Sequence, residues 1–321
     1  MSSDFTVAIP TYNGEDRLPN ILAKLLAQTR VENIQWEIII IDNNSTDNTA
    51  KVVQDYQANW QQTYPLKYYF EAEQGAAFAR LRAVREATGV FIGFLDDDNL
   101  PDADWVAVAY AFGQAHPQAG AYSGQIHGDY AVSPPPNFAR IQAFLAVREH
   151  GAVAHLFDPE HLRLPPGAAL VVRKQAWLDV PTNPIFKGRV GKSLVGGEDY
   201  EVLLHMHNRG WEIWYNPAQQ TYHQIPQWRL EKDYLLAISR ACGLPTCQLR
   251  FINAKAWQKP VIFFRIILSN LFRAIQHIIK YKMQVKTDIV LACELEFYLA
   301  NMVSPWYALT NLRSKDIPKN K

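Results

Sequence analysis

The chain has 321 residues, of which 48% are hydrophobic, and a net charge of +1 at pH 7. A chain of this length and balance can bury a large core, and its lack of a basic excess argues against nucleic acid as a partner. Its three cysteines, Cys242, Cys247 and Cys293, are too few and too scattered for a disulfide framework, so we expect reduced thiols in a cytoplasmic protein.

Short apolar runs alternate with helical patterns over the first 125 residues. Nearly continuous apolar strands separated by helices indicate a mostly parallel central sheet with helices on both faces. Ligands of such sheets bind beyond the carboxyl ends of the strands. The expected strands are FTVAI, WEIIIID, LKYYF, VFIGFLD and AGAYSG, and the expected helices are EDRLPNILAKLLAQ, a segment starting near Asp47, GAAFARLRAVREATG and ADWVAVAYAFGQAH.

The remainder of the chain is less regular and then becomes helical. Prolines in residues 126–195 predict loops, with a helix near 138–150 and a strand at AALVV. The segment GGEDYEVLLHMHNRG predicts a helix that ends at Gly210, and WEIWY predicts a strand after it. We therefore expect one sheet-based domain over 1–228, in two halves (1–125 and 126–228), and a helical region over 229–321.

Polar side chains follow three of the predicted strands. They are PTYN at 10–13, DNNSTDNT at 42–49 and DDDN at 96–99. A single aspartate in such a place is most often a turn or cap residue. Here several carboxylates share one edge of the sheet, and oxygen ligands of this kind suit Mg²⁺ or Mn²⁺ together with phosphate oxygens. The sequence therefore predicts a site for a metal and a diphosphate.

These motifs, in this order, resemble family 2 glycosyltransferases. The resemblance rests on PTYN, IIIIDNNSTDNT, EQGAAFARLRAVREATGVFIGFLDDDN and the later GGEDYE, and it covers about residues 5–225. It implies the GT-A fold and an inverting transfer from a nucleotide-sugar donor. The segment YHQIPQWRL adds a similarity to cyanobacterial glycosyltransferases of hormogonium polysaccharide synthesis.

The resemblance implies roles for the donor-side residues. Pro10 and Tyr12 match residues that hold the nucleoside, and Asp42 matches the acid that reads the base or ribose. Asp96 and Asp98 match the D-x-D pair. Asp98 is the expected metal ligand and Asp96 lies closer to the ribose or donor sugar. Two further residues complete the donor side: Asp97 at the variable middle position and Arg80, which either touches the diphosphate or pairs with an aspartate.

The remaining candidate residues are Glu198 and Asp199 on the acceptor side and His223 near the metal. Transfer needs a carboxylate that takes the proton of the acceptor hydroxyl, and Asp199 is the expected base with Glu198 orienting it or contacting the acceptor. The structural alternative is that both carboxylates only stabilise the N-terminus of the helix through its dipole. His223 lies where related GT-A enzymes have a histidine near the metal or diphosphate, and it could supply a further ligand there. The alternative is that His223 is a structural residue held by hydrogen bonds.

The helical region contains one segment of unbalanced charge. Seven basic residues and no acidic one fall between Lys255 and Lys286, and VIFFRIILSNLFRAIQHIIKYK has a wide apolar face. Charges recur within the segment, so it is a poor spanning helix, and we expect contact with a membrane surface instead. Packing on the catalytic domain or on a second protomer is the alternative, and the oligomeric state stays open.

The sequence thus predicts an inverting, metal-dependent glycosyltransferase of polysaccharide biosynthesis. We expect a UDP-sugar donor, a saccharide or lipid-linked saccharide acceptor, Mn²⁺ or Mg²⁺ as the cofactor, and a cytoplasmic location that includes the inner membrane face. Two alternatives remain: a nucleotidyltransferase, which would release pyrophosphate from a nucleoside triphosphate, and a non-catalytic nucleotide-sugar-binding protein on the same fold.

Overall fold

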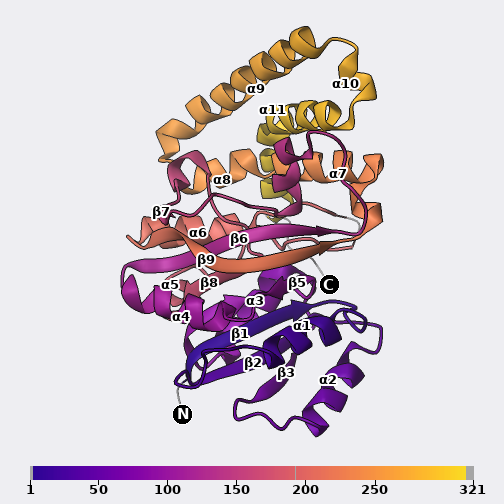
Figure 1. The fold of residues 1–321 in the computed structure, drawn as a ribbon. Coiled ribbons are helices and arrows are strands. Elements are labelled where there is room, and N and C mark those ends of the chain that lie inside the picture. The colour runs from indigo at the N-terminus through magenta and orange to yellow at the C-terminus, as the bar shows by residue number, and fades with distance from the viewer. Residues whose placement is uncertain (1–2, 192, 316–321) are drawn as a thin grey trace, which may run out of the picture. The chain divides into compact units, whose positions relative to one another are not determined.

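A computed structural model describes residues 3–191 and 193–315 (Figure 1). The chain divides into two compact units, which we describe separately. The first, the sheet unit, ends at Ile225. The second, the helical unit, takes in the C-terminal helices and two short segments from the middle of the chain. The sheet unit consists of residues up to Asp129, Ala146–Val190 and Glu198–Ile225, and the helical unit of Tyr130–Leu145, Gly191–Gly197 and Pro226 onward.

The sheet unit is built on a mixed sheet. One half is parallel, in the order β3-β2-β1-β4, and the other half is antiparallel, in the order β8-β6-β9-β5, with β7 paired to β9. The prediction of a mostly parallel sheet is therefore correct only for the first four apolar runs. The strands are β1 (Ser3–Thr11), β2 (Trp36–Asp42), β3 (Leu66–Phe70), β4 (Gly89–Phe94), β5 (Asn99–Pro101), β6 (Ala119–Tyr130), β7 (His155–Leu156), β8 (Leu170–Arg173) and β9 (Glu212–Ile225).

Helices of the sheet unit form two packed groups. Helix α1 contacts α2, and α6 contacts both α3 and α5. Their apolar faces meet strands whose side chains are almost fully excluded from solvent, such as Phe5, Ile38 and Phe91. Burial of these faces gives most of the driving force for the fold. The helices are α1 (Leu18–Leu26), α2 (Thr49–Ala58), α3 (Ala76–Glu86), α4 (Trp105–Ala115), α5 (Lys174–Leu178) and α6 (Glu198–Asn208).

Three predictions about local structure need correction. The helix expected at 138–150 is replaced by two 3-10 turns, Phe138–Arg140 and Gln142–Leu145, between residues of left-handed φ at Asn137 and Ala146. Strand β9 does not stop after WEIWY but runs on to Ile225. Strand β5, which was not among the expected strands, pairs with the far end of β9. Backbone pairing between distant segments decides the last two, and local patterns do not carry that information.

The helical unit is organised around its last helix. Helix α11 packs against α7, α8, α9 and α10, and an ion pair joins Arg140 to Glu294 on α11. Cys247 and Cys293 are buried free thiols, as expected from the sequence, and Cys242 is half-buried. The helices are α7 (Lys232–Gly243), α8 (Thr246–Ile252), α9 (Lys259–Tyr281), α10 (Gln284–Thr287) and α11 (Ile289–Lys315).

Candidate functional site

Three parallel strands end at one edge of the sheet unit. Thr11 at the end of β1 is paired with Asp42 at the end of β2, and the N–H of Leu95 after β4 donates to the carbonyl of Ala8 in β1. Parallel register therefore brings the three polar segments that follow these strands to one place, as the sequence predicts. The side chains of Asp42 and of the aspartates 96–98 lie at this edge.

Asp42 is buried at the end of β2 with both oxygens hydrogen-bonded. Its Oδ1 accepts from the N–H of Ser45 at 2.9 Å, and its Oδ2 accepts from the hydroxyl of Tyr68 at 2.7 Å. Burial and this contact raise the pKa of Tyr68, which keeps the phenol a donor. Tyr12, by contrast, is 48% exposed, and Pro10 is half-buried within β1. The predicted contacts of these three residues with a nucleoside stay predictions.

The middle aspartate of the triplet is held by the protein itself. Asp97 accepts a hydrogen bond from the hydroxyl of Thr11 at 2.5 Å and two from Arg17, at 2.7 Å from Nε and 3.0 Å from Nη2. Gly14 lies against this pair, because a Cβ at that position would stand 2.1 Å from the Thr11 oxygen. Asp97 therefore anchors the segment after β1, and its predicted role in donor binding stays a prediction.

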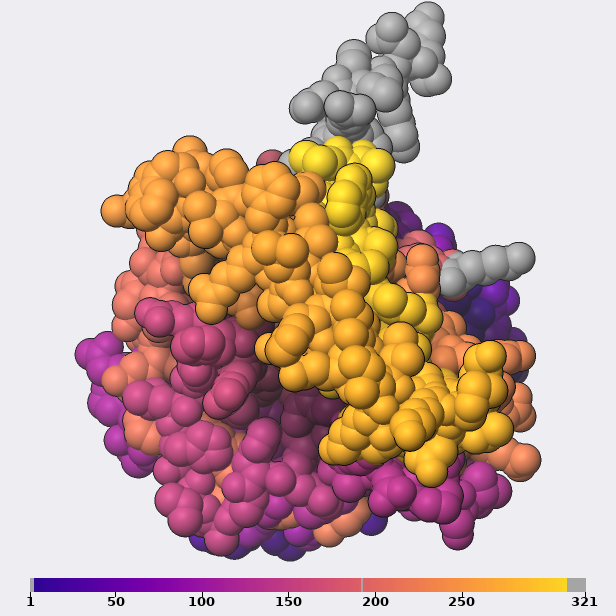
Figure 2. All heavy atoms as spheres, turned by 90° about the horizontal axis from the view of Figure 1, so that it is seen from above, coloured from indigo at the N-terminus to yellow at the C-terminus, as the bar shows by residue number. Residues whose placement is uncertain are grey.

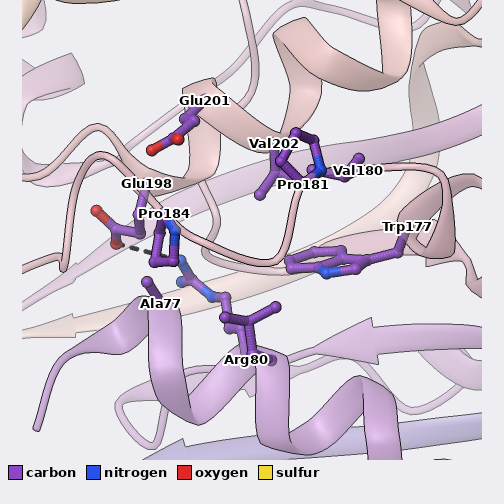
Figure 3. A pocket seen from close by; sticks show the side chains of 10 residues that line it. Ala77, Arg80, Trp177, Val180, Pro181, Pro184, Glu198, Glu201 and Val202 are labelled. Carbon is purple, nitrogen blue, oxygen red and sulfur yellow. Dashed lines mark hydrogen bonds and ion pairs between the residues drawn. The ribbon is translucent and has the colours of Figure 1, made fainter. Parts of the chain in front are cut away.

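Arg80 links the donor side of the site to the acceptor side. The side chain rises from α3, with Nη2 3.4 Å from Oδ1 of Asp96 and Nη1 3.2 Å from Oε1 of Glu198 (Figure 3). Burial on its own would lower the pKa of Arg80, but the charges of Asp96 and Glu198 outweigh it and raise that pKa. The sequence left two roles open for Arg80, contact with the diphosphate or pairing with an aspartate. The structure shows Arg80 paired with Asp96 and Glu198.

The segment LPPG passes directly over this arginine. A Cβ added at Gly167 would lie 2.5 to 2.6 Å from the guanidinium atoms of Arg80, so any larger residue there would require Arg80 to move. The N–H of Gly167 donates to Oδ2 of Asp199 at 2.7 Å. One residue thus contacts Arg80 and holds Asp199, and sequence reasoning missed it because the segment was read only as a loop.

The first turn of α6 carries the acidic pair. Burial, and then the negative charge of Asp199, raise the pKa of Glu198. Asp199 is half-buried and is fixed by Gly167. One turn further on, both oxygens of Glu201 accept hydrogen bonds from the N–H of Ile185, and one of them also from the N–H of Phe186. Glu201, which sequence reasoning also missed, ties a loop to the same helix.

A pocket lies beside the Arg80–Glu198 pair, between α3, α5 and α6 (Figure 3). Figure 3 shows a largely apolar wall around three charged side chains, those of Arg80, Glu198 and Glu201. A low-polarity surrounding strengthens the attraction between the guanidinium and the carboxylates. The apolar wall consists of Ala77, Leu81, Trp177, Val180, Pro181, Pro184 and Val202.

The third aspartate lies beside the predicted histidine. Pairing of β5 with β9 places Asn99 opposite His223, and Nε2 of His223 is 3.4 Å from Oδ2 of Asp98. Oδ1 of Asp98 accepts from the side-chain amide of Asn99 at 2.8 Å. The structure thus brings together two residues that the sequence assigned to metal binding from segments far apart in the chain.

This pair fits part of the coordination shell of a divalent cation. The carboxylate oxygen suits Mn²⁺ and Mg²⁺ alike, whereas an imidazole nitrogen is a ligand of transition-metal ions, so the pair as a whole favours Mn²⁺ over Mg²⁺. Within residues 3–191 and 193–315, no group of three or more His, Cys, Asp or Glu side chains could hold a metal ion. The remaining ligands would therefore have to come from phosphate and water, which is usual for a metal bound together with a nucleotide.

The arrangement of the sheet and its helices is the GT-A type of fold. In fold the chain resembles the mannosyltransferase PcManGT of Pyrobaculum calidifontis, solved with GDP-Man and Mn²⁺, with a TM-score of 0.58 and 20% identity over 100% of this chain and 77% of that one. Residues 6–155 match the model of glycosyl transferase family 2. The match takes in somewhat less than half of the chain, and this part is similar to a family 2 glycosyltransferase domain.

Curated relatives agree with this family. The chain is 30% identical over 292 residues to validoxylamine A glucosyltransferase of Streptomyces hygroscopicus subsp. limoneus. The aligned region covers 84% of this chain and 61% of that protein. It is 33% identical over 106 residues to the UDP-Glc:alpha-D-GlcNAc-diphosphoundecaprenol beta-1,3-glucosyltransferase WfgD of Escherichia coli, covering 32% and 38% of the two chains. Five of the curated relatives are matched over only 25% to 38% of their own length.

Proposed function

We propose that this protein transfers a sugar from a nucleotide-diphosphate donor to a saccharide or lipid-linked saccharide acceptor, with inversion at the anomeric carbon and with a divalent cation. The single observation that carries the proposal is the contact between Asp98 and His223. Asp98 belongs to the same aspartate segment as Asp96, which pairs with Arg80, and Arg80 in turn pairs with Glu198. A nucleotide-sugar donor needs a site of this composition, with ligands for a metal–diphosphate on one side and carboxylates on the other.

On the donor side, Asp98 and His223 would hold the cation. When bound, Mn²⁺ or Mg²⁺ neutralises the diphosphate that leaves with the nucleoside. Tyr12, exposed at the rim, offers a ring against which a base can stack, and Asp42 is held by Ser45 in the place from which it would read the base or ribose. UDP is the expected nucleotide. Comparison of UDP, GDP and ADP in binding experiments identifies the base.

On the acceptor side, Asp199 is the proposed base. It would take the proton of the acceptor hydroxyl as that oxygen bonds to the anomeric carbon and the bond to the diphosphate breaks. Its Oδ2 accepts from the N–H of Gly167 and its Oδ1 from the N–H of Tyr200, so both carboxylate oxygens are held in a defined orientation. Glu198 is a less suitable base because Arg80 occupies its Oε1.

The acceptor class is proposed from the relatives and the helical unit. WfgD, by its name, acts on a sugar linked to diphosphoundecaprenol. An acceptor with a lipid tail would remain at a membrane surface, and the helical unit carries an exposed apolar helix. We therefore propose polysaccharide synthesis on a lipid-linked acceptor, with the catalytic domain over 1–228.

Calorimetric titration of UDP, GDP and ADP, each with Mn²⁺, with Mg²⁺ and with EDTA, tests the donor site. We expect one diphosphate to bind selectively and only with metal, and Asp98→Ala to weaken this binding by at least about tenfold. Asp102→Ala, a change of the same type at an exposed position in the following segment, is the matched control and should bind as the wild type does. Metal-independent binding, or equal binding by Asp98→Ala, would refute the proposed site.

A further inference from the structure

The outward face of α9 in the helical unit is an uninterrupted apolar stripe. Its large side chains follow one another at spacings of three and four residues, which places them on one side of a helix. Phe264, Leu268, Phe272 and Ile279 are each between 61% and 68% exposed. In the view of Figure 2 the atoms of α9, in orange, lie open at the surface. We call this surface the apolar stripe; it consists of Trp257, Val261, Phe264, Leu268, Leu271, Phe272, Ile275, Ile278, Ile279 and Met283.

The opposite face of α9 is the one that packs in the protein. Its buried residues are Ile266, Asn270, Ala274 and His277. The ring of His277 contacts the carbonyl of Leu291 in α11 at 2.9 Å. A helix that only contributed to the core would turn its larger apolar side chains inward. In α9 only Ile266 among the buried residues is large and apolar, whereas ten large apolar side chains of the stripe face outward, so the stripe needs another cover.

Basic residues border the stripe. At about 100° per residue, Arg265, Arg273 and Lys280 fall along one of its flanks. The sequence from Lys255 to Lys286 contains seven basic residues and no acidic one. An apolar face with a purely basic border is the pattern of a helix that lies in the headgroup region of an anionic membrane. Trp257, 70% exposed just before α9, is a residue type enriched at that depth.

We infer that α9 is a membrane-docking helix, which lies in the interface of an anionic lipid bilayer with the apolar stripe inserted and the basic flank on the headgroup phosphates. The inference does not depend on the proposed transfer reaction. If that reaction is correct, docking would hold the enzyme at the surface where a lipid-linked acceptor is found.

Two other arrangements fit the observations less well. By length and composition, Ala256–Tyr281 is one helix in the described part of the chain that could cross a membrane, with mean hydropathy 1.4. To span, it would have to give up the packing of Asn270 and His277 and bury Arg265 and Arg273 in hydrocarbon. A second copy docked on the stripe would bring the same basic flank to both sides of the interface, with no acid between 255 and 286 to compensate it.

The test is co-sedimentation of the full chain with vesicles of phosphatidylcholine alone and of phosphatidylcholine with an equal part of phosphatidylglycerol. We expect strong binding to the anionic vesicles and weak binding to the neutral ones. Leu268→Asp should weaken binding to the anionic vesicles by at least about tenfold, because it puts a charge into the inserted face. Arg265→Gln together with Arg273→Gln should weaken binding to the anionic vesicles only.

The matched control is Leu178→Asp, which places the same charge at an equally exposed leucine of α5 (60% against 63%). It should bind vesicles as the wild type does, and thermal unfolding should show all variants folded. Lack of vesicle binding, or binding that Leu268→Asp leaves unchanged, would overturn the inference. So would a dimer in sedimentation velocity that Leu268→Asp dissociates, without vesicle binding, or retention in membranes after carbonate extraction, which would mark a spanning helix.

Discussion

Nη1 of Arg80 lies 3.2 Å from Oε1 of Glu198, so a buried ion pair joins α3 to the first turn of α6. The same guanidinium reaches Asp96, the first member of the D-x-D pair. The donor side and the acceptor side of the candidate site are therefore connected through one side chain. A shift of Arg80 would change its contacts with both Asp96 and Glu198, so this residue is the first target for mutation.

Arg80→Ala is expected to lower the free energy of unfolding by about 3–5 kcal/mol, because it leaves two carboxylates without their buried cation. Urea unfolding measures this difference. Arg85→Ala, at an exposed position on the same helix, is the control and should change stability by less than about 0.5 kcal/mol. Equal stability of the two variants would show that the pair contributes nothing to the fold.

Gly167→Ala is expected to displace Arg80, because the new methyl group would stand 2.5 Å from the guanidinium. We expect a loss of about 1–3 kcal/mol of stability, typical of overpacking, together with a fall in transfer activity. Gly151→Ala is the comparison, since no atom lies within 4 Å of its added Cβ and only its positive φ opposes the change. Activity that falls in Gly167→Ala but not in Gly151→Ala would be the expected result in a transfer assay. Loss in both variants to the same extent would instead indicate a general effect of backbone strain.

Glu37 is expected to make stability depend on pH at the acidic end. This carboxylate is almost fully buried in β2 and accepts hydrogen bonds from Lys67, Thr88 and Thr6. Burial acts to raise the pKa of Glu37, and the hydrogen bonds outweigh it, so the pKa in the folded protein is lowered. A lowered pKa means that the stabilisation is present above the unfolded value of about 4.3 and is lost as the pH falls through the folded value.

Unfolding of wild type and Glu37→Gln at pH 7 and in acid measures this effect. At pH 7 the variant should be less stable by about 1–3 kcal/mol, and the difference should shrink as the pH falls, because the wild-type carboxylate becomes neutral. Glu32→Gln, at an exposed position, should show neither effect. A difference that stays constant from pH 7 into acid would contradict the expectation.

Much of the fold was predictable from the sequence, because continuous apolar runs fix β1 to β4 and their parallel order places Asp42 and the aspartate triplet at one edge. The sequence could not show how the antiparallel half is paired. The register of β5 with β9 depends on backbone hydrogen bonds between distant segments, and it is this register that brings His223 to Asp98. Likewise, the contacts of Arg17 with Asp97 and of Gly167 with Arg80 arise only after folding.

His223→Ala is expected to separate metal binding from nucleotide binding. If His223 supplies one ligand, its loss should weaken the metal-dependent part of UDP binding by about 10–100-fold, while the weak binding in EDTA stays as in the wild type. The physical reason is that the imidazole contributes to the cation, whereas the base and ribose are held elsewhere at the sheet edge. If instead His223 is only a hydrogen-bonded structural residue, the variant should unfold more easily and keep its metal dependence.

Calorimetry with increasing Mn²⁺ at fixed UDP distinguishes these outcomes, since a lost ligand shifts the metal concentration at half-saturation and a loosened fold lowers the fraction of active protein. His161→Ala, at an exposed histidine that contacts only Asp158 three residues before it, is the matched control. It should leave both quantities unchanged. An unshifted Mn²⁺ titration in His223→Ala, in a variant that remains folded, would remove His223 from the metal site and leave Asp98 as the sole proposed protein ligand from this pair.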